Sequence, residues 1–171
     1  MTRRRCSWAT SEPELTYHDR EWGRPTKDEH RLFESLVLEG AQAGLSWNTI
    51  LRKRDGYRKA FASFDPAKVA RFSTARINAL VKDPAIVRHK QKIQSAVANA
   101  KAFLVVQTEF GSFARYLKSD AGVSPDALSK DLRSRGFNFV GPTIARAFMQ
   151  AIGMIDDHEP GCWRYKAKGR P

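Results

Sequence analysis

The 171-residue chain is poor in cysteine and has no long apolar run. Its two cysteines cannot form the disulfide framework of a small secreted domain or supply the four ligands of an ordinary iron–sulfur cluster. No run approaches the ~18 apolar residues that a membrane-spanning helix needs, so we expect no membrane partner. The basic start, Met1–Cys6, is followed by no apolar stretch. We therefore expect no secretory signal and a cytoplasmic location, where a cysteine pair more often binds metal or takes part in catalysis.

The chain also lacks convincing strand patterns. Phe137–Val140 alternates in polarity but is too short for a strand. Apolar residues instead recur at spacings of three and four, which is typical of helices packed against a core. We expect an all-α fold, in one domain spanning residues 1–171, with helices over 30–40, 47–64, 66–72, 74–83, 86–104, 125–135 and 143–152.

Capping residues mark several of the expected helix ends. Ser73 and Ser124 are suited to start helices, because a serine side chain can accept a hydrogen bond from a free N–H of the first turn. Gly40, Gly136 and Gly153 are predicted to close helices, since glycine tolerates the left-handed conformation that often follows a last turn.

Positive charge exceeds negative charge and is unevenly placed. Lys and Arg number 30 against 18 Asp and Glu, a net charge of +12. Residues 1–30 are neutral, whereas residues 51–101 carry 13 basic and 3 acidic side chains. We call residues 51–101 the basic block. Such a block favours binding to a nucleic acid backbone, and the alternative is a solvated helix face that aids solubility.

The segment Gly136–Gly141 connects two expected helices and contains a glycine at each end. It leads into the start of the next helix at Pro142-Thr143, where free N–H groups favour an anion. A helix–hairpin–helix of this shape can hold a DNA phosphate without reading sequence. The alternative is an ordinary helix–helix connection.

Four potential soft-metal ligands lie near the chain ends: Cys6, His18, His158 and Cys162. Two thiolates and two imidazoles suffice for a tetrahedral zinc site. Such a site would leave no position for water, so it would be structural and would tie both ends of the chain to the helical body. The alternative is two unrelated cysteines and two surface histidines.

Aromatic residues and one unusual glutamate point to a binding pocket. Trp8, Tyr17, Trp22 and Trp47 lie near the proposed metal ligands of the N-terminal part, and such rings can stack on nucleobases or simply fill a core. Glu39 ends the apolar stretch Leu36–Leu38. It can point into a pocket or merely end the apolar face in solvent.

Taken together, the motifs resemble the 3-methyladenine DNA glycosylase I family of bacteria, within the helix–hairpin–helix superfamily. The matching strings run in the family's order over nearly the whole chain: residues 6–8, 17–23, 38–47, 86–89 with 92–93, 135–141, 148–151, and 157–158 with Cys162.

The resemblance implies a role for each matching position. The zinc (Zn²⁺) ligands would be Cys6, His18, His158 and Cys162. Glu39 and Tyr17 would hydrogen-bond an extruded base, Trp47 would stack on it, and Trp8 and Trp22 would complete the aromatic wall. Gly44 and Leu45 would enter the gap in the duplex, while Phe137, Gly141 and Thr143 would contact the DNA backbone.

The implied activity is removal of N3-methyladenine from alkylated double-stranded DNA by a monomeric enzyme. This base carries a positive charge, so a carboxylate and electron-rich rings favour it over neutral adenine. No lysine stands out as a Schiff-base nucleophile, so we expect base excision without strand cleavage. Two alternatives remain: a DNA-binding module with zinc and no chemistry, and a glycosylase that prefers another lesion, such as N3-methylguanine or a deaminated purine.

Asp156 departs from the pattern of the resembling family. Related superfamily enzymes place a catalytic aspartate in a similar string, a residue that this family is generally described as lacking. Here Asp156 occupies that place, two residues before His158. Asp156 therefore has either a catalytic role or a supporting role beside a metal ligand.

Overall fold

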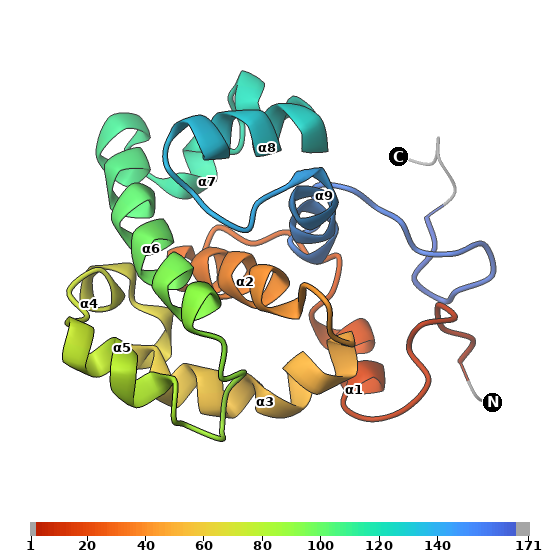
Figure 1. The fold of residues 1–171 in the computed structure, drawn as a ribbon. Coiled ribbons are helices and arrows are strands. Elements are labelled where there is room, and N and C mark those ends of the chain that lie inside the picture. The colour runs from red at the N-terminus through yellow and green to blue at the C-terminus, as the bar shows by residue number, and fades with distance from the viewer. Residues whose placement is uncertain (1–2, 167–171) are drawn as a thin grey trace.

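All regular structure in the described part of the chain, residues 3–166, is helical, and the predicted all-α class is confirmed (Figure 1). No helix of this part is long and apolar enough to cross a bilayer. In this computed structural model the α-helices are α1 Glu14–Arg20, α2 Glu29–Gln42, α3 Trp47–Ala60, α4 Pro66–Val69, α5 Thr74–Leu80, α6 Lys90–Phe110, α7 Phe113–Tyr116, α8 Pro125–Ser134 and α9 Pro142–Ala151. Two short 3-10 helices, η1 Ala62–Phe64 and η2 Asp120–Val123, complete the set.

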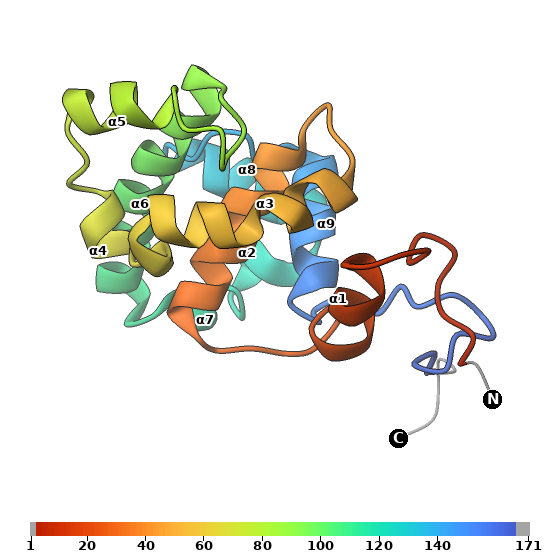
Figure 2. The same ribbon diagram turned by 90° about the horizontal axis from the view of Figure 1, so that it is seen from below.

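Helix α2 lies at the centre of the molecule and packs against α3, α6, α7 and α9 (Figures 1 and 2). Leu32 and Phe33 of this helix are fully buried and face the aromatic rings of the core, including Phe103 at 5.3 Å from Phe33. Burying such a side chain contributes about 1.5–3 kcal/mol. The centre of the core therefore fixes the position of the last turn of α2, which holds Glu39.

Side-chain caps set several helix starts, as predicted for Ser73 and Ser124. The Ser73 hydroxyl accepts from the N–H of Arg76, and the Ser124 hydroxyl accepts from the N–H of Ala127. Gly136 adopts φ +89° directly after the C-cap of α8, so the predicted glycine closure of this helix is confirmed.

The prediction that Gly40 closes its helix was wrong. Helix α2 continues to Gln42, and the glycine in the left-handed conformation is Gly44, at φ +77°. Gly40 instead allows close packing, because a Cβ there would lie 3.3 Å from the Cβ and carbonyl oxygen of Phe139, which would have to shift slightly. The close contact brings the end of α2 against the 136–141 segment.

Other predicted boundaries were also wrong, including the ends of 66–72 and 74–83, which stop at Val69 and Leu80, and the end of the long helix, which is at Phe110. The helix from Trp47 ends at Ala60 rather than at Phe64, because residues 62–64 take positive φ values and turn the chain. The long helix begins at Lys90, four residues after Ile86, which is buried in the preceding loop.

The two ends of the described chain lie side by side, at the side of the molecule away from α4 and α5 (Figures 1 and 2). The N–H of Trp163 donates to the carbonyl of Arg4 at 2.9 Å. The Ser7 hydroxyl and the Glu159 carboxylate lie 2.5 Å apart. These contacts bring the predicted metal ligands of the two ends to one place.

Candidate active site

A cleft of about 540 Å³ opens between the N-terminal segment, α1, α2, α3 and α9. The five residues predicted to bind the base all line it, although they come from separate segments. The full lining is Trp8, Glu14, Tyr17, Trp22, Glu39, Gln42, Trp47, Ala147, Gln150 and Asp157. Four of these residues are aromatic and five carry carboxyl or amide groups, a combination that can bind a polar, planar ligand.

The aromatic side chains form a continuous wall. The ring centroids of Trp8 and Trp22 lie 5.2 Å apart with a near-perpendicular arrangement, and those of Tyr17 and Trp47 lie 5.4 Å apart. Tilted and edge-on contacts of this kind leave ring faces exposed to the cleft. A flat base can therefore stack against the wall.

Glu39 is the buried carboxyl of the cleft, with only 4% of its surface exposed. Within residues 3–166 it forms no hydrogen bond or ion pair. Burial raises the pKa of Glu39 to about 8. A carboxyl group in this environment is costly to ionise, and it would be stabilised by a cation or a hydrogen-bond donor that enters the cleft.

The other five residues of the cleft were not predicted as site residues: Glu14, Gln42, Ala147, Gln150 and Asp157. The Gln150 side-chain amide donates to the Asp157 carboxylate, which also pairs with Arg146. Helical spacing could have indicated one of them, because Gln42 lies three residues after Glu39 on α2.

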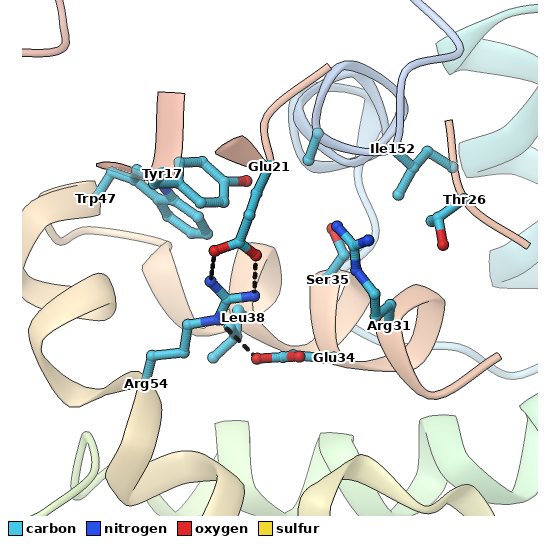
Figure 3. A pocket seen from close by; sticks show the side chains of 11 residues that line it. Tyr17, Glu21, Thr26, Arg31, Glu34, Ser35, Leu38, Trp47, Arg54 and Ile152 are labelled. Carbon is cyan, nitrogen blue, oxygen red and sulfur yellow. Dashed lines mark hydrogen bonds and ion pairs between the residues drawn. The ribbon is translucent and has the colours of Figure 1, made fainter. Parts of the chain in front are cut away.

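An ion cluster lies behind the aromatic wall, around a small cavity of about 30 Å³ (Figure 3). The Arg54 guanidinium forms two hydrogen bonds with Glu21, at 2.9 and 2.7 Å, and a third with Glu34 at 2.7 Å. Tyr17 and Trp47 line both this cavity and the cleft, so they divide the two. The cluster joins α1, α2 and α3 beneath the wall and stabilises its shape.

Cys6, His18 and Cys162 form a group that could hold a metal ion, since their ligand atoms all lie within 4.8 Å of one another. All three side chains are buried. The Cys6 sulfur accepts from the N–H of Glu159 at 3.3 Å, and the Cys162 sulfur accepts from that of Arg164 at 3.4 Å. Burial raises the pKa of the Cys6 thiol to about 11, so a nearby cation would be needed to hold it as a thiolate at neutral pH.

His158, the fourth predicted ligand, lies beside this group. Its ring centroid is 5.4 Å from that of His18, and its Nε2 is buried without a hydrogen-bond partner in residues 3–166. Its other nitrogen, Nδ1, is 2.6 Å from the Asp156 carboxylate, while Nδ1 of His18 is 2.9 Å from Asp19. Metal-binding histidines commonly have their second nitrogen oriented by a carboxylate in this way.

Comparison with known proteins identifies the family of this chain from matches over most of its length. The family model described as methyladenine glycosylase matches residues 8–127 and 121–165. The DNA-3-methyladenine glycosylase 1 of Escherichia coli (strain K12) is 43% identical over 180 residues, covering 94% of this chain and 96% of that protein. The chain belongs to the methyladenine glycosylase family.

Solved structures of this family share the fold. A crystal structure of 3-methyladenine DNA glycosylase I superposes with a TM-score of 0.89 at 40% identity, covering 95% of this chain and 100% of that one. A variant of 3-methyladenine DNA glycosylase I in complex with 3-methyladenine superposes with a TM-score of 0.86 at 34% identity, covering 95% and 99%.

In this methyladenine glycosylase fold, the predicted DNA-contacting residues divide into exposed and buried ones. Gly44 and Leu45 lie in the exposed loop between Gln42 and Trp47, which both line the cleft, and Leu45 is 40% exposed. Thr143 is exposed in the first turn of α9. Phe137 is buried, and its N–H donates to the carbonyl of Leu132. Phe137 therefore anchors the loop in the core, and its contact with the DNA backbone stays a prediction.

Asp156 does not line the cleft. Its carboxylate accepts from the main-chain N–H of His158 at 3.2 Å, in addition to contacting the ring. Of the two roles considered for Asp156, the structure favours support of His158 over catalysis.

Several cations of the basic block form ion pairs or hydrogen bonds within the protein. Arg54 belongs to the ion cluster, Arg76 donates to the carbonyl of Ala60, and Lys53 donates to that of Pro84. Formal charge therefore overstates the number of cations in this block that are available to a phosphate backbone.

Proposed function

We propose that this protein removes N3-methyladenine from alkylated double-stranded DNA, as the names of its relatives describe for those proteins. The reaction would hydrolyse the N-glycosidic bond, release free 3-methyladenine and leave an abasic site for base-excision repair. The observation that carries the proposal is Glu39, a buried carboxyl without a partner in the described chain, which faces an aromatic cleft of the right size for a base.

The chemistry of the lesion fits this cleft. N3-methyladenine in DNA carries a positive charge, so its glycosidic bond is already weak and its departure requires little protonation. An ionised Glu39 would attract the cation, and the faces of Trp47 and Tyr17 would add cation–π attraction. Neutral adenine would gain neither term, and the buried carboxyl would remain costly to ionise beside it. Discrimination between the two bases would therefore arise from charge.

A base inside a duplex must leave the stack before it can enter such a cleft. The loop that carries Gly44 and Leu45 suits this step, because Leu45 is exposed and the loop connects Gln42 and Trp47, which both line the cleft. The Leu45 side chain would occupy the gap that the extruded base leaves behind. Gly44 permits the sharp turn, since its φ is +77° and no atom lies within 4 Å of the position of a Cβ.

The 136–141 segment and the start of α9 would hold the DNA backbone as a helix–hairpin–helix. The N-cap of α9 is Gly141, which has no side chain to accept from the first-turn N–H groups. A Cβ at Gly141 would meet nothing within 4 Å, so a phosphate could approach closely there. Main-chain N–H groups near Gly141 and Thr143 would then contact phosphate without reading sequence.

No lysine lines the cleft in residues 3–166. This supports hydrolysis by water, without a covalent enzyme–sugar intermediate and without strand cleavage. Water would attack the sugar as the base departs, and the developing charge on the sugar would be stabilised by the DNA phosphates.

We further propose that Cys6, His18, His158 and Cys162 together bind one structural Zn²⁺. Two cysteines and two histidines suit zinc, and the unpartnered Nε2 of His158 supplies the fourth donor. The ion would fix the terminal segments against α1 and thereby hold Trp8 and Trp22 in the aromatic wall. The zinc would take no part in the reaction, since four protein ligands fill its coordination sphere.

The deciding experiment is release of free base from methylated DNA. The protein should release 3-methyladenine and leave alkali-labile abasic sites without cutting the strand. The variant Glu39→Gln should lose selectivity for 3-methyladenine over adenine. The control is Glu109→Gln, which alters an exposed glutamate outside the cleft and should keep this selectivity. Binding without release would instead indicate a DNA-binding module, and preferential release of N3-methylguanine or a deaminated purine would indicate another lesion.

A further inference from the structure

The C-terminal end of α2 is held by an element that is distant in sequence. This end carries Glu39 and leads into the loop 43–46 with Leu45 at its tip. The last carbonyls of any helix lack partners within the helix. Here the loop supplies two of the missing donors, since Ala43 N–H donates to Gly40 and Leu45 N–H donates to Gln42.

Two further carbonyls at this end accept from a lysine of α6. Nζ of Lys92 lies 2.9 Å from the carbonyl oxygen of Ala41 and 2.5 Å from that of Ala43. The ammonium group thus joins the last turn of α2 to the first residue of the loop. A positive charge is favourable beside the C-terminus of a helix, because the free carbonyls give that end a partial negative charge.

The positive charge of Lys92 does not stabilise α6, the helix that carries it. Lys92 lies in the first turn of α6, where the helix dipole disfavours a cation. Lys92 is also partly buried, which lowers its pKa, and Lys90 of the same turn is exposed. The contacts of Lys92 with α2 and the loop therefore explain its position better than a role in a solvated basic face does.

We propose that Lys92 is a positioning residue for base extrusion. Its ammonium group fixes the loop 43–46 to the body of the protein, so that Leu45 is held at the rim of the cleft. Lys92 thus acts with the loop, and is distinct from those cations of the basic block that meet DNA phosphates. This inference deepens the proposed function and rests on it, because the loop matters for excision only if a base is extruded from DNA.

The test compares Lys92→Met with its matched control, Lys90→Met. Single-turnover excision is measured at saturating enzyme on two duplexes: one with the lesion paired normally, the other with an abasic site opposite the lesion, where extrusion is easier. Duplex affinity is measured over a range of salt concentrations.

For Lys92→Met we expect the rate on the paired duplex to fall by about tenfold or more, the loss typical of charge-assisted hydrogen bonds. The fall should be much smaller on the duplex with the opposing abasic site, and the salt dependence of binding should be unchanged. For Lys90→Met the saturated rates should be unchanged, and the salt slope should fall by about 1 if Lys90 contacts a phosphate.

An equal loss of rate on both duplexes would overturn the inference, as would unchanged rates with a reduced salt slope, which would make Lys92 a phosphate contact. If Lys92→Met does not fold, Lys92→Gln provides the same comparison with one donor retained. If the parental protein releases no base from either duplex, the proposed function fails. Amide hydrogen exchange then tests the contact itself: the Leu45 N–H should exchange faster in Lys92→Met than in Lys90→Met, and equal exchange would refute it.

Discussion

Replacing Glu39 by glutamine should make the protein more stable, and increasingly so as the pH rises. The pKa of the buried carboxyl is raised from 4.5 to about 8, because it is removed from water. In the unfolded chain the same group ionises freely near its ordinary pKa. The unfolded state therefore releases a proton that the folded state retains between these two values, and stability falls as the pH rises through this window.

The size of the effect follows from the two pKa values. Below the ordinary pKa both states are protonated, and Glu39 costs nothing through ionisation. The linkage relation gives a cost of about 2 kcal/mol at pH 6 and about 4 kcal/mol at pH 8, with little further change at higher pH. Glutamine has a similar shape and no charge, so Glu39→Gln should remove this cost.

Urea unfolding of both proteins at pH 6 and pH 8, with zinc present, measures the difference. The other titrating groups are common to both chains and cancel in the comparison. We expect the stability advantage of Glu39→Gln to grow by about 2 kcal/mol between the two pH values. An advantage that is the same at both would refute the reasoning, since the carboxyl would then ionise as easily in the folded protein as in water.

Three other perturbations test the supporting structure. Arg54→Met should lower the free energy of unfolding by about 1.5–3 kcal/mol in urea titrations, because it removes the partner of Glu21 while Glu34 keeps its ion pair with Arg58; a change below about 1 kcal/mol would mean that water replaces the guanidinium. Denaturation in the presence of a chelator should release about one zinc per chain, and Cys162→Ser should release much less; native folding with no metal detected would reject the site. Asp156→Asn should weaken zinc retention by about 10- to 100-fold in chelator competition yet excise at the parental single-turnover rate when loaded with zinc, and a slow loaded enzyme would restore a catalytic role.

Local signals in the sequence predicted most of the helices. Ser73 and Ser124 cap the helices that they were expected to cap, and Gly136 follows α8 in the left-handed conformation. These features depend on contacts between residues three or four apart, so they can be predicted from the local sequence. The apolar periodicity of α2 likewise indicated its buried face.

Features that depend on packing between distant segments were not predicted from the sequence. Gly40 was predicted to end its helix, but α2 continues to Gln42, and the glycine packs closely against Phe139, ninety-nine residues later in the chain. Phe137 lies in a short connection between two helices, and its burial in the core was not predicted. Neither feature can be predicted from the residues that are nearby in the sequence.

The sequence by itself determined the helical class, the candidate residues of the site and the excess of positive charge. It did so because helix periodicity, capping and side-chain chemistry are properties of short segments. Only the tertiary structure decided that Glu39 is buried without a partner, that Asp156 supports His158, and that Lys92 is occupied by carbonyl groups of α2 and its loop. Burial and long-range partners set the pKa of a carboxyl and the availability of a cation, and both depend on residues that only the fold brings together.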